Sequence, residues 1–314
     1  MNLKKFVIAI GAASLTNIAA AKADIVVVTS IKPVHSLVSG VMAGVGTPSV
    51  IIEGAGSPHT YSLKPSQAKQ LQDAKLVFWM GDELETFLEG PIENIAQSAT
   101  AIKLIDAQGL KKIKFRDGGM FDNHGHDDHG DHDGHDDHGH GEFDPHVWLD
   151  PINAKAIIHE IEEALVKADP EHASTYEANA HKMMDKIDSL TAELREELEP
   201  VHENGFIVFH DAYQYFEQRF DLAAIGSITV SPEVMPGAER VSELRKKISE
   251  LNATCVFSEP QFEPKLVETL VEGTGARTGV LDPLGATLTK GPDLYFQLLR
   301  NMAFAIKKCL SGGN

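Results

Sequence analysis

Residues 25–30 of the chain are IVVVTS, and they lead directly into Ile31-Lys32-Pro33. This continuous run of mainly β-branched residues is typical of a strand that is buried on both faces in a parallel sheet. Pro33 suits the first turn of a helix, which the sequence predicts over residues 32–41. A buried strand that enters a helix without a gap is the first half of a βαβ unit, so this stretch predicts an α/β fold.

The same alternation of strand and helix continues along the chain. In the first half we predict strands at 49–53, 76–80 and 102–105, and helices at 65–74 and from residue 82 onward. In the second half we predict strands at 206–209, 224–228, 255–258 and 279–281, and helices at about 211–219, 237–251, 262–272 and 292–309. We therefore expect two α/β lobes, each with a mainly parallel sheet flanked by helices.

Two further helices are predicted between the halves, over residues 151–168 and 170–198. The second is charged along most of its length, and its narrow apolar stripe is typical of a rigid connector between lobes. The predicted organisation is an N-terminal lobe at 24–168, one long connecting helix at 169–200 and a C-terminal lobe at 201–314.

The first 23 residues have the features of a secretory signal peptide. Two lysines at positions 4 and 5 precede a short apolar stretch, which ends in Ala21-Lys22-Ala23. Cleavage there would leave Asp24 as the first residue. No cysteine lies near this point, which argues against a lipid anchor, and we expect a protein exported to the periplasm. No later segment is long and apolar enough to span a bilayer.

The chain is acidic, with a formal net charge of −18 that becomes −21 without the three lysines of residues 1–23. A nucleic-acid partner would require a basic face, so this class of partner is excluded. A metal cation suits the charge. The two cysteines, Cys255 and Cys309, are expected to form a disulfide, because the count is even and the protein is exported.

Seven histidines are interleaved with Asp and Gly between residues 124 and 140, and ten acidic residues occur within 117–144. The composition offers no apolar core, so we expect a mobile loop at 117–141. Imidazole and carboxylate groups together predict an accessory metal-collecting segment of lower affinity. Its histidines are His124, His126, His129, His132, His135, His138 and His140.

Three isolated histidines lie in loops or at strand ends, where α/β folds bind their ligands. His59 and His146 lie in Pro-containing turns, and His210 comes at the end of a predicted strand. Ligands in open α/β sheets bind beyond the carboxyl ends of the strands. Three neutral imidazoles with one open position form a tetrahedral zinc site, so these residues are candidate ligands.

Five motifs resemble those of the ZnuA family, the periplasmic zinc-binding proteins of bacterial ABC-type zinc importers. They are SPHTYSLKPS from residue 57, HVWLDP from 146, VFHDAYQYF from 208, EPQF from 259 and LDPLG from 281. The resemblance covers essentially the whole chain. It implies that His59, His146 and His210 hold Zn²⁺, the transported ligand, in a cleft between the lobes. It also implies a membrane permease as partner, and we expect a monomer.

The fourth metal ligand is left open. Some zinc-binding relatives have an acidic residue before the first histidine, where this chain has Pro58, which offers no side-chain ligand. Manganese-binding relatives use an aspartate of the second lobe, which Asp282 matches. Water, Asp282 and Glu259 are the alternatives, with Glu259 better suited to orienting a ligand.

Three other functions compete with zinc capture. The chain could capture another divalent metal such as manganese or nickel, it could be an exported zinc hydrolase, or it could be an adhesin on the same fold. A hydrolase needs a general base beside a metal-bound water, and no HExxH motif is present. We therefore predict that the protein is not an enzyme.

Overall fold

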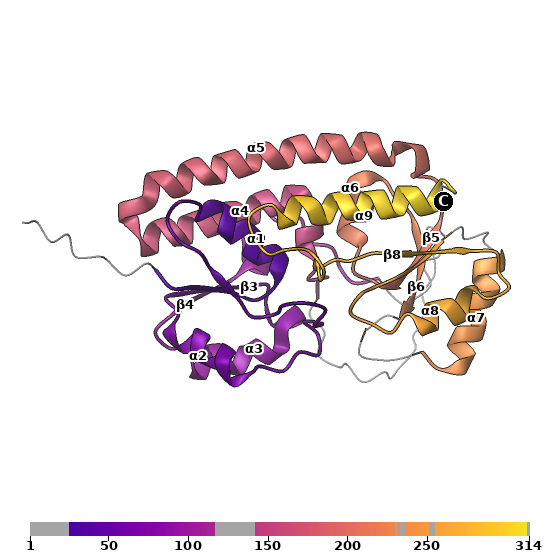
Figure 1. The fold of residues 1–314 in the computed structure, drawn as a ribbon, viewed down its shortest axis with the longest axis horizontal. Coiled ribbons are helices and arrows are strands. Elements are labelled where there is room, and N and C mark those ends of the chain that lie inside the picture. The colour runs from indigo at the N-terminus through magenta and orange to yellow at the C-terminus, as the bar shows by residue number, and fades with distance from the viewer. Residues whose placement is uncertain (1–24, 117–141, 230–231, 233–235, 251–254, 313–314) are drawn as a thin grey trace, which may run out of the picture.

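Two parallel β-sheets form the centres of two α/β lobes, which confirms the predicted fold class (Figure 1). The computed structural model describes residues 25–116, 142–229, 232, 236–250 and 255–312. The predicted signal peptide and the seven clustered histidines lie outside these residues. Among the described helices, none combines the length and the apolar character that a bilayer crossing needs.

The N-terminal lobe has the strand order β2-β1-β3-β4, and all of these strands are parallel. Its strands are β1 (Val27–Thr29), β2 (Ser49–Val50), β3 (Leu76–Trp79) and β4 (Thr100–Lys103), and its helices include α1 (Lys32–Val41), α2 (Pro65–Asp73) and α3 (Asp82–Asn94). The opening strand is fully buried, as its β-branched composition predicts. Helices α2 and α3 lie on one face of the sheet, and α1 lies on the other (Figure 1).

The C-terminal lobe repeats this arrangement with the strand order β6-β5-β7-β8. Its strands are β5 (Phe206–His210), β6 (Ala224–Thr229), β7 (Cys255–Ser258) and β8 (Arg277–Val280), and its helices include α6 (Gln214–Phe220), α7 (Ala238–Glu250) and α8 (Lys265–Val271). Alternate residues of β5 point to opposite faces. Ile207 and Phe209 belong to a small core with α7 and α8, while Phe206 and Val208 belong to the large core.

Two long helices, α5 (Ala173–Leu198) and α9 (Leu294–Leu310), run along both lobes and join them (Figure 1). Helix α4 (Pro151–Ala168) has the predicted bounds, and α5 begins after a 3-10 turn at Pro170–His172. The predicted apolar stripe of α5 lies in the core, with Met183, Ile187, Leu190, Leu194 and Leu198 buried and Met184 partly buried. The C-terminal helix α9 runs beside α5 and contacts α1 of the other lobe as well (Figure 1). The lobes are therefore tied along two helices.

Two strand predictions are displaced along the chain. The fourth strand is predicted at 102–105, but β4 pairs Thr100 with Leu76, and Leu104 and Ile105 are buried in a 3-10 turn beyond it. Strand β8 begins two residues before its predicted start, at an exposed edge of the sheet. Both segments are partly exposed, so the usual buried apolar run is missing from their sequences.

The predicted disulfide is confirmed. Cys255 at the start of β7 is bonded to Cys309 near the end of α9, with their Cα atoms 6.1 Å apart. The bond ties the helix that spans both lobes to the central part of the C-terminal sheet.

Candidate metal centre

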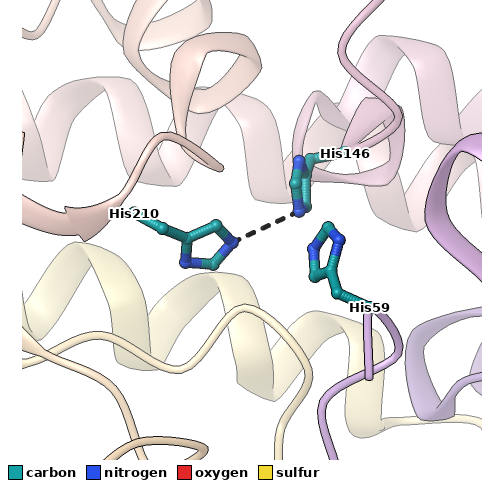
Figure 2. A group of neighbouring side chains, drawn as sticks. All are labelled: His59, His146 and His210. Atoms are coloured by element: carbon teal, nitrogen blue, oxygen red, sulfur yellow. Dashed lines mark hydrogen bonds between the residues drawn. The ribbon is translucent and has the colours of Figure 1, made fainter. Parts of the chain in front are cut away.

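Three histidines from distant parts of the chain meet between the lobes (Figure 2). His59 lies in the turn between β2 and α2. His146 lies just before the 3-10 turn Val147–Leu149, which leads into α4. His210 is the last residue of β5, at the carboxyl end of the C-terminal sheet. The ligand atoms of the three side chains all lie within 4.8 Å of one another.

The spacing of the rings suits a tetrahedral metal. The ring centroids lie 5.4 Å apart for His59 and His146, 5.7 Å for His59 and His210, and 5.3 Å for His146 and His210. The Nε2 atoms of His146 and His210 are 3.4 Å apart, as the dashed line in Figure 2 marks. Two nitrogens bound tetrahedrally at the usual Zn–N length lie roughly 3.3 Å apart.

Two of the rings are each held in place by a carboxylate of their own. Asp144 Oδ1 accepts a hydrogen bond from His146 Nδ1 at 2.7 Å and another from the His146 backbone N–H at 2.9 Å. Glu259 Oε1 accepts from His210 Nδ1 at 2.7 Å. A proton on each Nδ1 leaves the Nε2 lone pair directed towards the cluster, which is the tautomer that a metal ligand requires.

Burial and nearby charge shift the pKa values of these two rings in opposite directions. Burial, with the nearby His210, holds the pKa of His146 well below its ordinary value. Burial also opposes a charge on His210, but Glu259, together with Asp144 and Asp211, outweighs burial and raises the His210 pKa. Burial raises the pKa of Asp144 to about 7. The acidic groups around His210 therefore favour positive charge beside that ring.

The walls around the histidines are mostly apolar. Trp148, Phe262, Pro283 and Leu284 line the pocket with the three rings. Its cavity of about 10 Å³ has the size of one water-sized sphere. Such a pocket holds a small ion without space for a larger ligand.

The two carboxylates considered as a fourth ligand have different surroundings. Glu259 lines the pocket, with Oε1 engaged by His210. Asp282 Oδ2 accepts from the backbone N–H of Ala286 at 2.6 Å, and its Oδ1 accepts from that of Leu284 at 3.2 Å. Asp282 thus stabilises the turn in which it lies. It is not among the residues that line the described pocket.

An arginine that no sequence pattern singles out links the lobes beside this cluster. Arg116 donates to both carboxylates of Asp211 and Glu217, for example from Nε to Asp211 Oδ2 at 2.9 Å. Asp211 follows His210 directly, and both acids are nearly buried. No local pattern in the sequence pairs Arg116 with residues about a hundred positions away.

Known proteins that resemble this chain place it in a single family. The model of the ZnuA family, described as "Zinc-uptake complex component A periplasmic", matches residues 27–309. The high-affinity zinc uptake system protein ZnuA of Brucella suis is 56% identical over 308 residues, covering 91% of each chain. The protein of the same name from Yersinia pestis is 34% identical over 292 residues, covering 92% of each chain.

Solved structures resemble the whole fold. A crystal structure of ZnuA has a TM-score of 0.76 at 27% identity, covering 91% of this chain and 100% of that one. A 138–173 deletion mutant of ZnuA with zinc bound has a TM-score of 0.75, also at 27% identity, covering 91% and 98%.

Proposed function

Because this chain belongs to the ZnuA family of periplasmic zinc-uptake components, we propose that it captures Zn²⁺ between its lobes and delivers the ion to the membrane permease of an ABC-type importer. His59, His146 and His210 hold the ion in this proposal. Zinc is the transported ligand, and the protein carries out no reaction on it.

The observation that carries the proposal is the convergence of the three rings. Two come from the N-terminal lobe and one comes from the C-terminal lobe, so an ion bound to all three bridges the lobes. Two rings already have their Nδ1 atoms held by carboxylates, so little ordering is needed when zinc binds. A separation of the lobes would release the ion by breaking the set of ligands.

The ligand set favours borderline metals. Imidazole nitrogens suit Zn²⁺, whereas Mg²⁺ and Ca²⁺ prefer oxygen shells and Mn²⁺ prefers more carboxylate. Nickel, cobalt and copper accept the same nitrogen donors, so selectivity among these metals is part of the test below.

We propose that a water molecule, and not Asp282, completes the coordination. The oxygens of Asp282 accept hydrogen bonds from the amides of its turn, and Glu259 holds His210 in place. A hydrolase would need a general base beside that water. Engagement of Glu259 Oε1 by His210 favours binding over hydrolysis, and chelator-sensitive esterase activity would count against this proposal.

The histidine-rich segment remains a proposed accessory site. We expect it to bind zinc more weakly than the preformed cluster, because ordering a chain of this composition costs conformational entropy. Deleting residues 117–141 should remove the weaker class of sites in calorimetry and leave the tight one. Loss of the tight site instead would make the segment primary. We also propose export to the periplasm with cleavage before Asp24.

Alanine variants of the three ligands test the proposal. Each of His59→Ala, His146→Ala and His210→Ala should lower zinc affinity by more than about 100-fold in a chelator competition, since each removes a direct ligand. His181→Ala changes an exposed histidine of α5 and should leave the affinity unchanged. Competition with manganese and nickel, alongside metal analysis of the purified protein, measures selectivity. Near-wild-type zinc affinity in the ligand variants would refute the assignment.

A further inference from the structure

The turn at 282–288 forms part of the wall of the zinc pocket. Pro283 and Leu284 line the pocket, and the turn follows β8 of the C-terminal lobe. Gly285 adopts a left-handed conformation, with φ of +67°, which favours glycine at the centre of the turn. The position of this turn therefore determines how closely the pocket is covered.

A lysine of the other lobe reaches into this turn. Lys32, in the first turn of α1, donates from Nζ to the carbonyl oxygens of Gly285 at 2.5 Å, Ala286 at 3.0 Å and Leu288 at 2.7 Å. The residue is only 6% exposed. Three convergent carbonyl oxygens form a small cation site, and the lysine fills it with its own ammonium group.

The three carbonyl acceptors require the charged form of the Lys32 side chain. An ammonium group has three N–H donors, one for each carbonyl, whereas a neutral amine has two. Hydrogen bonds from a charged donor are also the stronger kind. Each of the three donors thus has an acceptor in the turn.

Asp282 binds the N–H groups of the same turn. Its carboxylate accepts from the backbone N–H groups of Leu284 and Ala286, while Lys32 donates to the carbonyls. The turn therefore lies between an anion of its own lobe and a cation of the other. A second link between the lobes joins Trp148 Nε1 to the carbonyl oxygen of Pro283 at 2.9 Å.

We propose that Lys32 is a positioning residue for zinc retention, which holds the 282–288 turn against the pocket as a tethered cation in a three-carbonyl site. This inference rests on the proposed function. Lys32 touches no metal ligand in the described contacts, so its effect on zinc acts through the pocket wall. It should slow the release of bound zinc.

Zinc release from full-length variants measures this effect. In a stopped-flow experiment with excess chelator, Lys32→Met should release zinc about 10-fold faster or more, as expected when groups that support a metal site are lost. Lys290→Met is the matched control, because Lys290 also links the lobes but forms an exposed ion pair with Glu53. The control should release zinc within about 2-fold of the wild type.

Chemical rescue separates a cation site from a general loss of packing. Ammonium chloride should slow zinc release from Lys32→Ala, because a free ammonium ion can occupy the three-carbonyl site. The same ionic strength of tetramethylammonium chloride, which has no N–H donors, should not. Equal effects of the two salts would contradict the cation site.

A measurement on the wild-type protein tests the inference even if the Lys32 variants do not fold. Partial acetylation should modify Lys32 at least about 10-fold more slowly than Lys290, since all three of its donors are engaged and it is buried. Equal modification of the two lysines would refute the inference.

The inference and the proposed function fail in different ways. If the wild type binds no zinc tightly, the proposed function fails. If the wild type holds zinc and folded Lys32→Met releases it at the wild-type rate, only the role of Lys32 is wrong.

Discussion

At the residue scale, the carboxylates behind the histidines decide how well the rings are placed. Asp144 and Glu259 each form a 2.7 Å hydrogen bond to an Nδ1 atom, and both acids are almost completely buried. These two contacts give both carboxylates the geometry of groups that orient a ligand imidazole. Asp211, the residue after His210, pairs with Arg116 and not with a ligand ring.

The Asp144 contact predicts a measurable loss of zinc affinity. Asp144→Asn should weaken zinc binding by about 10-fold to 100-fold, because the ring of His146 loses its charged acceptor. Asp169→Asn is a matched control, since Asp169 forms the same 2.7 Å contact with His172, an exposed histidine outside the metal cluster. Chelator competition compares the two. Equal affinities would show that Asp144 does not support the site.

A buried glutamate in the N-terminal lobe predicts a pH dependence of stability. Glu85 is fully buried in α3, and Oε2 accepts from the backbone N–H of Met80 at 2.7 Å. Burial raises its pKa from 4.5 to about 7. The protonated form therefore favours the folded state: its contribution is complete below pH 4.5 and is lost as the pH rises to about 7, which amounts to about 3 kcal/mol.

Glu85→Gln tests this dependence, since glutamine does not titrate. Between pH 4.5 and 7.5 the free energy of unfolding should fall less in this variant than in the wild type, as measured by urea titration. Glu89→Gln, an exposed change on the same helix, should keep the wild-type profile. An unchanged profile in Glu85→Gln would show that another group is responsible.

At the scale of elements, the sequence predicts most helices and buried strands because their patterns are local. Helices α1 and α4 have the predicted bounds, and the apolar run of β3 is buried throughout. The edges are less predictable. Strand β4 is displaced because it is set by pairing with β3 and not by its own composition. The three histidines could be predicted because each follows a strand or lies in a Pro-containing turn.

The disulfide gives a prediction about the C-terminal elements. Cys255 and Cys309 are 54 residues apart, and closing a loop of this length stabilises by about 4 kcal/mol in the chain-entropy model. Reduction should therefore lower the free energy of unfolding by about this amount in a urea titration. A Cys255→Ser, Cys309→Ser variant should not respond to the reductant. Equal stability of the reduced and oxidised wild type would contradict the estimate.

At the scale of the whole molecule, charged contacts hold the lobes together around the pocket. Arg116 pairs with two nearly buried acids of the C-terminal lobe, and Arg219 pairs with Asp150 at the start of α4. The sequence predicts two lobes and their connector but none of these contacts, since each depends on the packing of distant segments. The same reason explains why the role of Lys32 is visible only in the structure.

Removal of Arg116 should destabilise the joined lobes. Arg116→Gln leaves Asp211 and Glu217 without their guanidinium partner, and we expect a loss of about 3 kcal/mol in the free energy of unfolding near neutral pH. Lys111→Gln is the control, because Lys111 also reaches across to the other lobe but is exposed. Its change should stay within about 0.5 kcal/mol. Indistinguishable urea midpoints for the two variants would refute the structural role of Arg116.

The most direct test of the central claim is an anomalous diffraction measurement at the zinc edge, on crystals of the mature protein grown with one equivalent of zinc. The account predicts one strong peak between the lobes, about 2.0–2.1 Å from ring nitrogens of His59, His146 and His210. A zinc peak held by other residues, with these three rings free of metal, would contradict it.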